Sequence, residues 1–204
     1  MYPMSTLARR KTSYHHGDLR VALVQAAAAL LDERGVQGVS LREAARRAGV
    51  SHGAPYRHFA GREALLAELA REGFERLVAA LNAASPRGGR AVARAYLHFA
   101  LADPHRFHLM FALAAGAGRE AAWHDALLGT AHAFAGAFSG LAEAQDAQRA
   151  AVAAWSLVHG LAQLMLDGHV GGAVSGESAS ERFADEVLGA LRFSLRAHAP
   201  RPVS

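Results

Sequence analysis

The chain has 204 residues, of which 51% are hydrophobic and 20% are charged, and this balance fits one compact helical protein or a small domain that feeds a larger one. It contains no cysteine, which excludes disulfide bonds, thiolate metal sites and a cysteine nucleophile. No apolar run is long enough to span a bilayer, and no apolar core follows the basic residues near the N-terminus, so we expect a soluble cytoplasmic protein without a secretory signal.

The positive charge is concentrated in the first third of the chain. Residues 1–60 contain nine Arg and Lys against four Asp and Glu, a net charge of +5, whereas the whole chain has 22 against 18, a net charge of +4. This asymmetry favours a polyanion-binding N-terminal region on a near-neutral body, although a basic segment can also be no more than a solvated surface.

Helix-ending and helix-capping residues divide the first 50 residues. Leucine and alanine recur at helical spacing over residues 17–34, and Gly35 is placed to end that helix. Ser40 and Glu43 form the capping box of a second, short helix, in which each side chain binds the other's backbone amide. Gly49 can adopt the left-handed conformation that ends this helix.

A third short helix is expected over residues 51–59, with Ser51 as its N-cap. Two short helices joined by a turn have the proportions of a helix-turn-helix, whose second helix enters the DNA major groove, and an ordinary helical corner without a ligand is the alternative. Pro55 cannot donate its amide, so the third helix is expected to begin late or to bend. In this arrangement Val50 and Phe59 face inward.

The rest of the chain reads as a helical body. A long helix starts at Arg62, with one apolar face over about 20 residues, and Pro86 breaks it. Further helices are expected over residues 91–102, 105–114, 120–141, 146–167 and 178–197. The prediction is an all-α fold of about nine helices, with a DNA-binding domain over 15–75 (turn and recognition helix at about 40–59) and a ligand-binding and dimerisation domain over 86–198.

Residues 38–59, followed by 62–66, resemble the N-terminal domain of the tetracycline-repressor (TetR) family. The matching features are the glycine-ended second helix, the Tyr56-x-His-Phe end of the third and the basic Arg62 that opens the fourth. Residues 103–111 and the Trp155-x-x-x-His-Gly segment resemble the C-terminal domain of one branch of that family. The resemblance implies a homodimeric transcriptional regulator, usually a repressor, whose affinity for its operator is altered by a small molecule, and no enzymatic activity.

Positions carried over from the family give the candidate DNA-binding residues. The resemblance places His52, Gly53, Ala54 and Tyr56 near bases and Ser40, Arg42, Tyr56, His58 and Arg62 near phosphates. Ser51 and Arg57 complete this candidate set. We expect base reading to rest on His52, Tyr56 and Arg57, on contact of Ala54 with a thymine methyl, and on DNA shape.

The large side chains of the body, interleaved with alanine and glycine, form either a cavity for a small apolar or aromatic effector or an ordinary packed core. The resemblance favours the cavity, with His124 or His159 as its polar group. The candidate ligand-binding residues are Tyr96, Phe99, Phe107, Met110, Phe111, Trp123, His124, Phe134, Trp155 and His159.

Dimerisation is expected through the helices over about 146–167 and 178–197, which would form a four-helix seam between subunits. The expected seam residues are Ala151, Ala154, Trp155, Val158, Leu161, Ala162 and Met165 on the first helix and Phe183, Val187, Leu191 and Leu195 on the second. Two-fold symmetry then predicts a pseudo-palindromic operator with recognition helices about 34–36 Å apart.

Other functional classes have little support in the sequence. It contains no His-Glu-x-x-His motif, no strand-bound phosphate loop and no Gly-x-Ser-x-Gly elbow, so no metal, no cofactor and no enzymatic reaction is expected. Histidines lie near Asp103, but Asp103 followed by Pro104 is better explained as the N-cap and first-turn proline of a helix than as part of a metal site. The alternative function is a helical small-molecule carrier or interaction protein whose basic head docks an acidic partner.

Overall fold

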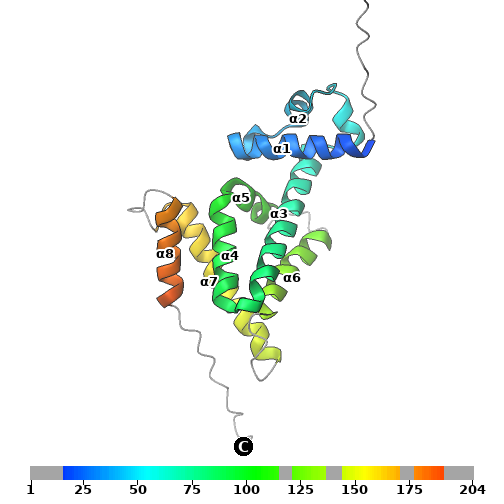
Figure 1. Cartoon of the computed structure of the whole chain (residues 1–204). Coiled ribbons are helices and arrows are strands. Elements are labelled where there is room, and N and C mark those ends of the chain that lie inside the picture. Colours follow the sequence, from blue (N-terminus) through cyan, green and yellow to red (C-terminus); the bar gives the residue numbers. More distant parts are fainter. Residues whose placement is uncertain (1–15, 115–120, 137–143, 171–176, 191–204) are drawn as a thin grey trace, which may run out of the picture. The chain divides into compact units, whose positions relative to one another are not determined.

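The structure, a computed structural model, describes residues 16–114, 121–136, 144–170 and 177–190. Within these ranges it contains eight α-helices, two 3-10 helices and no strand, which confirms the all-α fold (Figure 1). The chain divides into two compact units, residues 1–65 and 66–204, so the division falls within α3 (Arg62–Ala84).

The first unit is built on α1 (His16–Gly38). Its apolar face is fully buried, and the residues of that face are Leu23, Val24, Ala27, Leu30 and Leu31. Gly35 has φ 64° and ψ −172°, a conformation that favours glycine and interrupts the helix. The regular helix therefore stops where the sequence predicted, and residues 36–38 add a short turn.

Helix α2 (Leu41–Arg47) has both of its predicted ends. The Glu43 amide donates to the Ser40 hydroxyl oxygen at 3.2 Å, which confirms half of the capping box. At the other end Gly49 has φ 70°, and the amides of Gly49 and Val50 donate to the carbonyls of Arg46 and Ala45. This pair of hydrogen bonds is a Schellman motif, which stops the helix and turns the chain.

The prediction of a third helix over residues 51–59 was wrong in extent. The structure has a four-residue 3-10 helix, η1 (Ala54–Arg57), with Pro55 in its first turn. Proline has no amide hydrogen, so residues 51–53 remain in the preceding turn. The third helix therefore begins late, as the sequence predicted. The Pro55 carbonyl accepts the amides of both His58 and Phe59 at 2.9 Å. Pro55 and Phe59 are buried and anchor the segment, whereas Val50 is only half-buried.

Helix α4 is the central helix of the second unit. This unit contains most of α3, then η2 (Ser85–Arg87), α4 (Gly89–Ala102), α5 (Pro104–Ala114), α6 (Ala121–Gly136), α7 (Ala144–Leu166) and α8 (Glu177–Ala190). α4 contacts α5, α6, α7 and α8, and α6 also packs along α7. Val92, Tyr96 and Ala100 of α4 are fully buried, so this helix contributes much of the core.

The residues expected at the intersubunit seam were partly wrong. Ala151, Ala154, Val158, Leu161 and Ala162 of α7 are buried within the chain itself, whose α4 and α6 pack on α7. Of the residues expected on α8, Phe183 and Val187 are half-buried, and Leu191 and Leu195 lie outside the described residues. Apolar periodicity identifies a buried face but does not say which chain covers it.

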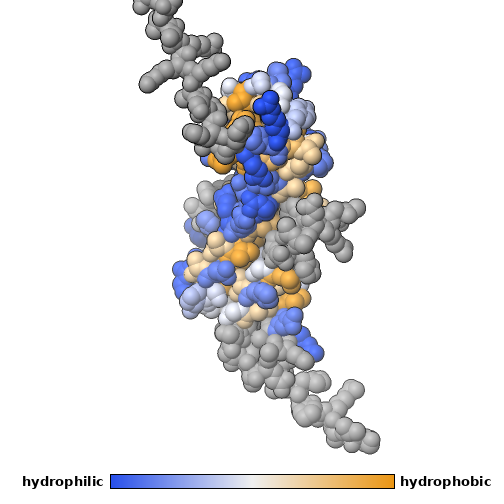
Figure 2. All heavy atoms as spheres, turned by 90° about the vertical axis from the view of Figure 1, so that its right-hand side faces the viewer, coloured by the Kyte–Doolittle hydropathy of each residue, from blue (hydrophilic) through white to orange (hydrophobic). Residues whose placement is uncertain are grey.

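The outer face of α7 carries exposed apolar side chains instead. Val152, Leu157 and Leu164 are 49%, 38% and 43% exposed. Hydrophobic side chains also reach the surface in small separate patches on the face drawn in Figure 2. Scattered single residues of this kind are ordinary, but Leu157 and Leu164, seven residues apart on one face of α7, indicate a contact surface.

Candidate nucleic-acid interface and aromatic cluster

The turn around η1 exposes most of the residues predicted to contact DNA. Tyr56 is 63% exposed, and the other exposed candidates are Arg42, Ser51, His52, Gly53 and Arg57. Ala54 is half-buried. Arg42 belongs to α2, whereas the other exposed residues belong to the segment that the buried Pro55 and Phe59 hold in place.

Two other candidates take part in contacts that hold the fold. The Ser40 hydroxyl accepts the Glu43 amide, as described above. Arg62 donates from Nε to the Val39 carbonyl at 2.8 Å and from Nη2 to the Val36 carbonyl at 2.7 Å. These carbonyls follow the break at Gly35, so the Arg62 guanidinium joins the end of α1 to the start of α3.

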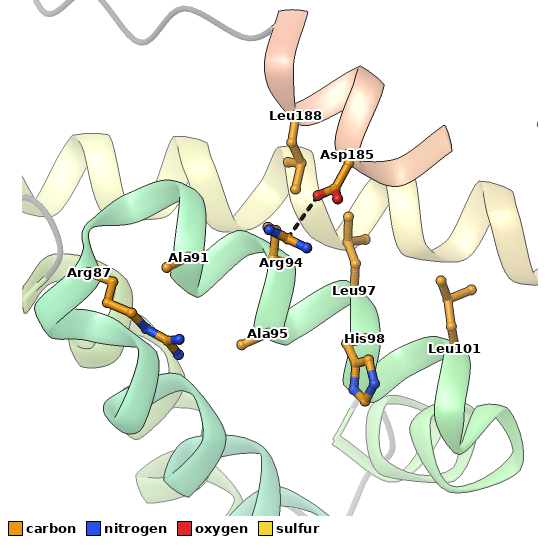
Figure 3. Close-up of a pocket in the computed structure, with 9 residues that line it drawn as sticks. All are labelled: Arg87, Ala91, Arg94, Ala95, Leu97, His98, Leu101, Asp185 and Leu188. Carbon is orange, nitrogen blue, oxygen red and sulfur yellow. Dashed lines mark ion pairs between the residues drawn. The ribbon is translucent and has the colours of Figure 1, made fainter. Parts of the chain in front are cut away.

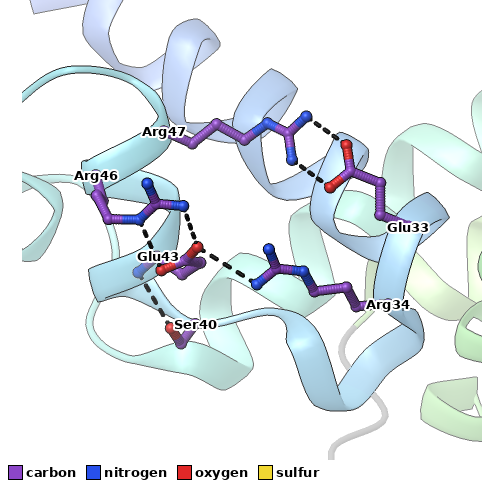
Figure 4. A network of polar contacts seen from close by, with 6 residues as sticks. All are labelled: Glu33, Arg34, Ser40, Glu43, Arg46 and Arg47. Carbon is purple, nitrogen blue, oxygen red and sulfur yellow. Dashed lines mark hydrogen bonds and ion pairs between the residues drawn. The ribbon is translucent and has the colours of Figure 1, made fainter.

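The arginines at the end of α2 are neutralised within the unit (Figure 4). Arg47 binds both carboxylate oxygens of Glu33, and Arg46 binds both oxygens of Glu43. Arg34 lies 3.4 Å from the same Glu43 carboxylate. The hydrogen bonds from Arg47 and Arg46 lower the pKa values of Glu33 and Glu43, respectively. Exposed pairs of this kind add little stability, but they cancel charge locally.

Arg42 and Arg57 differ from these paired arginines. Both are exposed, and neither forms an ion pair with an acidic side chain in the part of the chain that the structure describes. Arg20 lies over the Phe59 ring, 5.2 Å from its centroid. Arg42, on α2, and Arg57, on η1, therefore leave positive charge uncompensated on the surface of this unit.

His58 is placed differently from its exposed neighbours. Its side chain is half-buried, and Nε2 is buried without a hydrogen-bond partner. A nitrogen in this position reaches a phosphate only if the ring moves.

The second unit brings six of the predicted ligand-binding residues into one aromatic cluster. These residues are Tyr96, Phe107, Phe111, Phe134, Trp155 and His159. The Phe111 ring centroid lies 4.9 Å from that of Phe107 and 4.5 Å from that of His159, and Tyr96 lies edge-on to Phe107 and Phe134. Met110 and Phe99 are also buried. Trp123 and His124 belong to α6, but their side chains lie outside the described residues.

A hydrogen-bonded chain runs through this cluster. The Trp155 indole donates to the Tyr96 hydroxyl at 3.3 Å, and that hydroxyl lies 2.8 Å from His159 Nδ1. Because the indole nitrogen can only donate, the Tyr96 hydroxyl both accepts and donates when it donates to Nδ1, and the His159 hydrogen is then on Nε2. Burial raises the pKa of Tyr96 and lowers the pKa of His159, so both groups are held in their neutral forms.

The predicted cap of α5 is confirmed. Asp103 Oδ1 accepts the Arg106 amide at 3.2 Å, and Oδ2 accepts from Arg106 Nε at 2.7 Å. The described residues contain no group of three or more His, Asp or Glu side chains placed to hold a metal ion. In the same ranges, no helix combines the length and the apolar character that crossing a membrane requires.

Two family models match the chain. Residues 23–69 match the model described as bacterial regulatory proteins, tetR family, and residues 90–199 match the tetracyclin repressor-like C-terminal domain. The first match covers the exposed turn, and the second covers the aromatic cluster.

Sequence relatives carry names of the same kind. The HTH-type transcriptional repressor Rv3405c of Mycobacterium tuberculosis is 33% identical over 98 residues, which are 44% of this chain and 52% of that protein. The HTH-type transcriptional regulator Mb3439c of Mycobacterium bovis matches with the same figures. The chain thus spans about half the length of the curated relatives it matches.

Solved structures resemble the chain over most of its length. A protein of unknown function from Rhodococcus sp. RHA1 is 35% identical, with a TM-score of 0.68, and the match covers 87% of this chain and 97% of that one. A bacterial regulatory protein in the tetR family from Rhodococcus RHA1 is 21% identical with a TM-score of 0.62, covering 84% and 93%. At that identity the second likeness concerns the fold alone.

Proposed function

The chain belongs to the TetR family of bacterial transcriptional regulators, which are not enzymes, and on this premise we propose that it binds a pseudo-palindromic DNA operator as a homodimer and represses transcription there. A small apolar effector releases it from the operator. The observation that carries the proposal is the exposed Tyr56, next to the exposed Arg57, on a turn that the buried Pro55 and Phe59 hold in place.

The DNA-binding residues divide into two groups in this proposal. His52, Tyr56 and Arg57 approach base edges, with Ala54 against a thymine methyl, while Gly53 adds no side chain between the turn and the groove. The residues that meet the phosphate backbone, or hold the groups that do, are Ser40, Arg42, Ser51, His58 and Arg62. Ser40 and Arg62 act mainly by positioning α2 and the start of α3, because both are already bound to the protein itself.

Dimerisation uses the outer face of α7. Leu157 and Leu164 are seven residues apart, so they lie on one side of the helix, and both are exposed in the single chain; Val152 is exposed too, but about 140° around the helix from Leu157. In a two-fold symmetric pair the same face of both subunits meets, so one row of apolar residues covers the other. In this proposal the exposed residues of α7 form the dimer contact, in place of the inward-facing residues that the sequence suggested.

The effector is proposed to enter beside the aromatic cluster. His159 and Trp155 are half-buried, so a guest can reach them from outside, and the His159 Nε2 hydrogen offers a donor to an oxygen of the guest. The Phe111 ring contacts His159 and also lies edge-on to Phe74 of α3, with ring centroids 5.3 Å apart. A guest that moves Phe111 thereby acts on α3, whose first residues belong to the DNA-binding unit. A coupling of about 1–3 kcal/mol is typical of such switches.

Selection of binding sites from random DNA with the purified protein tests the proposal. We expect an inverted repeat, bound about a thousandfold or more tightly than random DNA, with an affinity that falls steeply with salt. Recovery of no preferred sequence would favour the alternative, a carrier or interaction protein whose basic head docks an acidic partner. In that case the exposed turn would bind acidic proteins and DNA of any sequence alike.

A further inference from the structure

A groove of about 340 Å³ lies between α4 and α8, and its lining contains none of the residues of the aromatic cluster (Figure 3). α8 is fastened to α4 there by two contacts of Asp185. Arg94 Nε lies 2.8 Å from the Asp185 carboxylate, and Arg90 donates to the Asp185 backbone carbonyl at 3.4 Å. Leu188, one turn further along α8, is 5% exposed and forms part of the wall.

The side chains that line this groove change from basic to apolar along α4. Arg87, at the end of η2, lies at one end, and Leu97 and Leu101 lie toward the other, with Arg94 between them (Figure 3). Arg87 is exposed and forms no ion pair with any acidic side chain in the described ranges. The lining thus contains two arginines and one aspartate, and that aspartate is already bound to Arg94.

We propose that this groove is a second ligand site, specific for an organic monocarboxylate with a short apolar chain. The carboxylate binds the Arg87 guanidinium, whose planar fork matches its two oxygens. The chain lies against Leu97, Leu101 and Leu188. The volume falls within the range of small-molecule pockets, roughly 300–1,000 Å³. A neutral apolar guest would cover Arg87 without replacing its hydrogen bonds to water, which disfavours it.

The site is independent of DNA binding and of the aromatic cluster. The effector proposed above enters beside Tyr96 and His159, whereas the monocarboxylate contacts η2, α4 and α8. A bound monocarboxylate bridges η2 and α8, so it is expected to raise the thermal unfolding midpoint slightly.

Isothermal titration calorimetry of the full chain with three ligands of equal chain length tests the proposal. Octanoate is expected to bind, while octanol and octylammonium bind at least about tenfold more weakly, because only the carboxylate pairs with Arg87. Arg87→Ala is expected to weaken octanoate binding about tenfold. Arg46→Ala, which removes the same charge away from the groove, is the matched control and leaves octanoate binding unchanged.

A second variant changes the affinity in the opposite direction. Asp185→Asn frees Arg94 for the ligand and removes the one carboxylate of the lining, so octanoate binds more tightly. Thermal unfolding of each variant shows that it is folded, and if Asp185→Asn fails to fold, Arg87→Ala decides alone. The proposal is overturned if octanoate does not bind, if octanol binds equally well, or if Arg87→Ala leaves the affinity unchanged. Loss of octanoate binding in His159→Gln but not in Arg87→Ala overturns it too, since the ligand would then occupy the aromatic cluster.

Discussion

Arginines of the DNA-binding unit that carry the same charge are expected to contribute very differently to operator binding. Arg57 is exposed and lacks an acidic partner in the described ranges, whereas Arg46 binds both oxygens of Glu43. Arg57→Ala should cost about 1–3 kcal/mol of operator binding if it removes a base-edge contact, with relaxed preference at one base pair. Arg46→Ala should cost much less, because Glu43 already holds that guanidinium.

The comparison is controlled for net charge, since both variants lose one positive charge from the same unit. Fluorescence anisotropy with the selected operator, at four or five salt concentrations, gives the affinity and its salt dependence. Arg42→Ala, if Arg42 contacts a phosphate, should weaken all sequences alike and reduce the salt slope by about one. Equal losses for Arg46→Ala and Arg57→Ala would refute the reasoning, because pairing within the protein would then not decide which arginines meet DNA.

Three further predictions concern assembly, packing and pH. Leu157→Glu on the outer face of α7 should convert the dimer to a monomer in analytical ultracentrifugation, whereas Leu128→Glu, an equally exposed apolar site on α6, should not. Gly73→Ala should lower the free energy of unfolding by about 1–3 kcal/mol in urea, because its methyl would lie 2.6 Å from the Met110 sulfur. Burial lowers the pKa of His159, so the unfolded chain binds more protons and stability should fall as the pH drops below about 6.5, less so in His159→Gln.

Each of these predictions has an outcome that contradicts it. A dimer that survives Leu157→Glu would remove α7 from the interface. Gly53→Ala, where nothing lies within 4 Å of the added methyl, is the control for Gly73→Ala, and equal losses would show that the close approach to Met110 is unimportant. An unchanged pH dependence in His159→Gln would mean that other histidines account for the acid sensitivity.

Local signals in the sequence located the elements well. The capping pair Ser40 and Glu43 and the glycines at 35 and 49 act through their own backbone conformations, so the ends of α1 and α2 could be read without the fold. The short η1 was harder to predict, because Pro55 indicates where a helix begins but not that it remains a single 3-10 turn.

Contacts between residues distant in sequence account for the rest. The ion pair of Arg46 with Glu43 spans three residues and could have been anticipated from helical spacing. Arg47 reaches Glu33 across 14 residues, and Arg62 reaches carbonyls 23 and 26 residues away, so both depend on how α1, α2 and α3 pack. For the same reason the sequence could not show which residues of α7 the chain covers itself.

The short η1 separates the buried residues that support the exposed turn from the exposed residues proposed to meet DNA. Pro55 and Phe59 are buried and support the turn, while Ser51, His52 and Gly53 stand on its exposed side. Substitutions at these three positions therefore break no hydrogen bond within a helix and remove few packing contacts. Exchanging a few surface side chains could therefore give descendants of this protein new operators, while their melting temperature stays nearly constant.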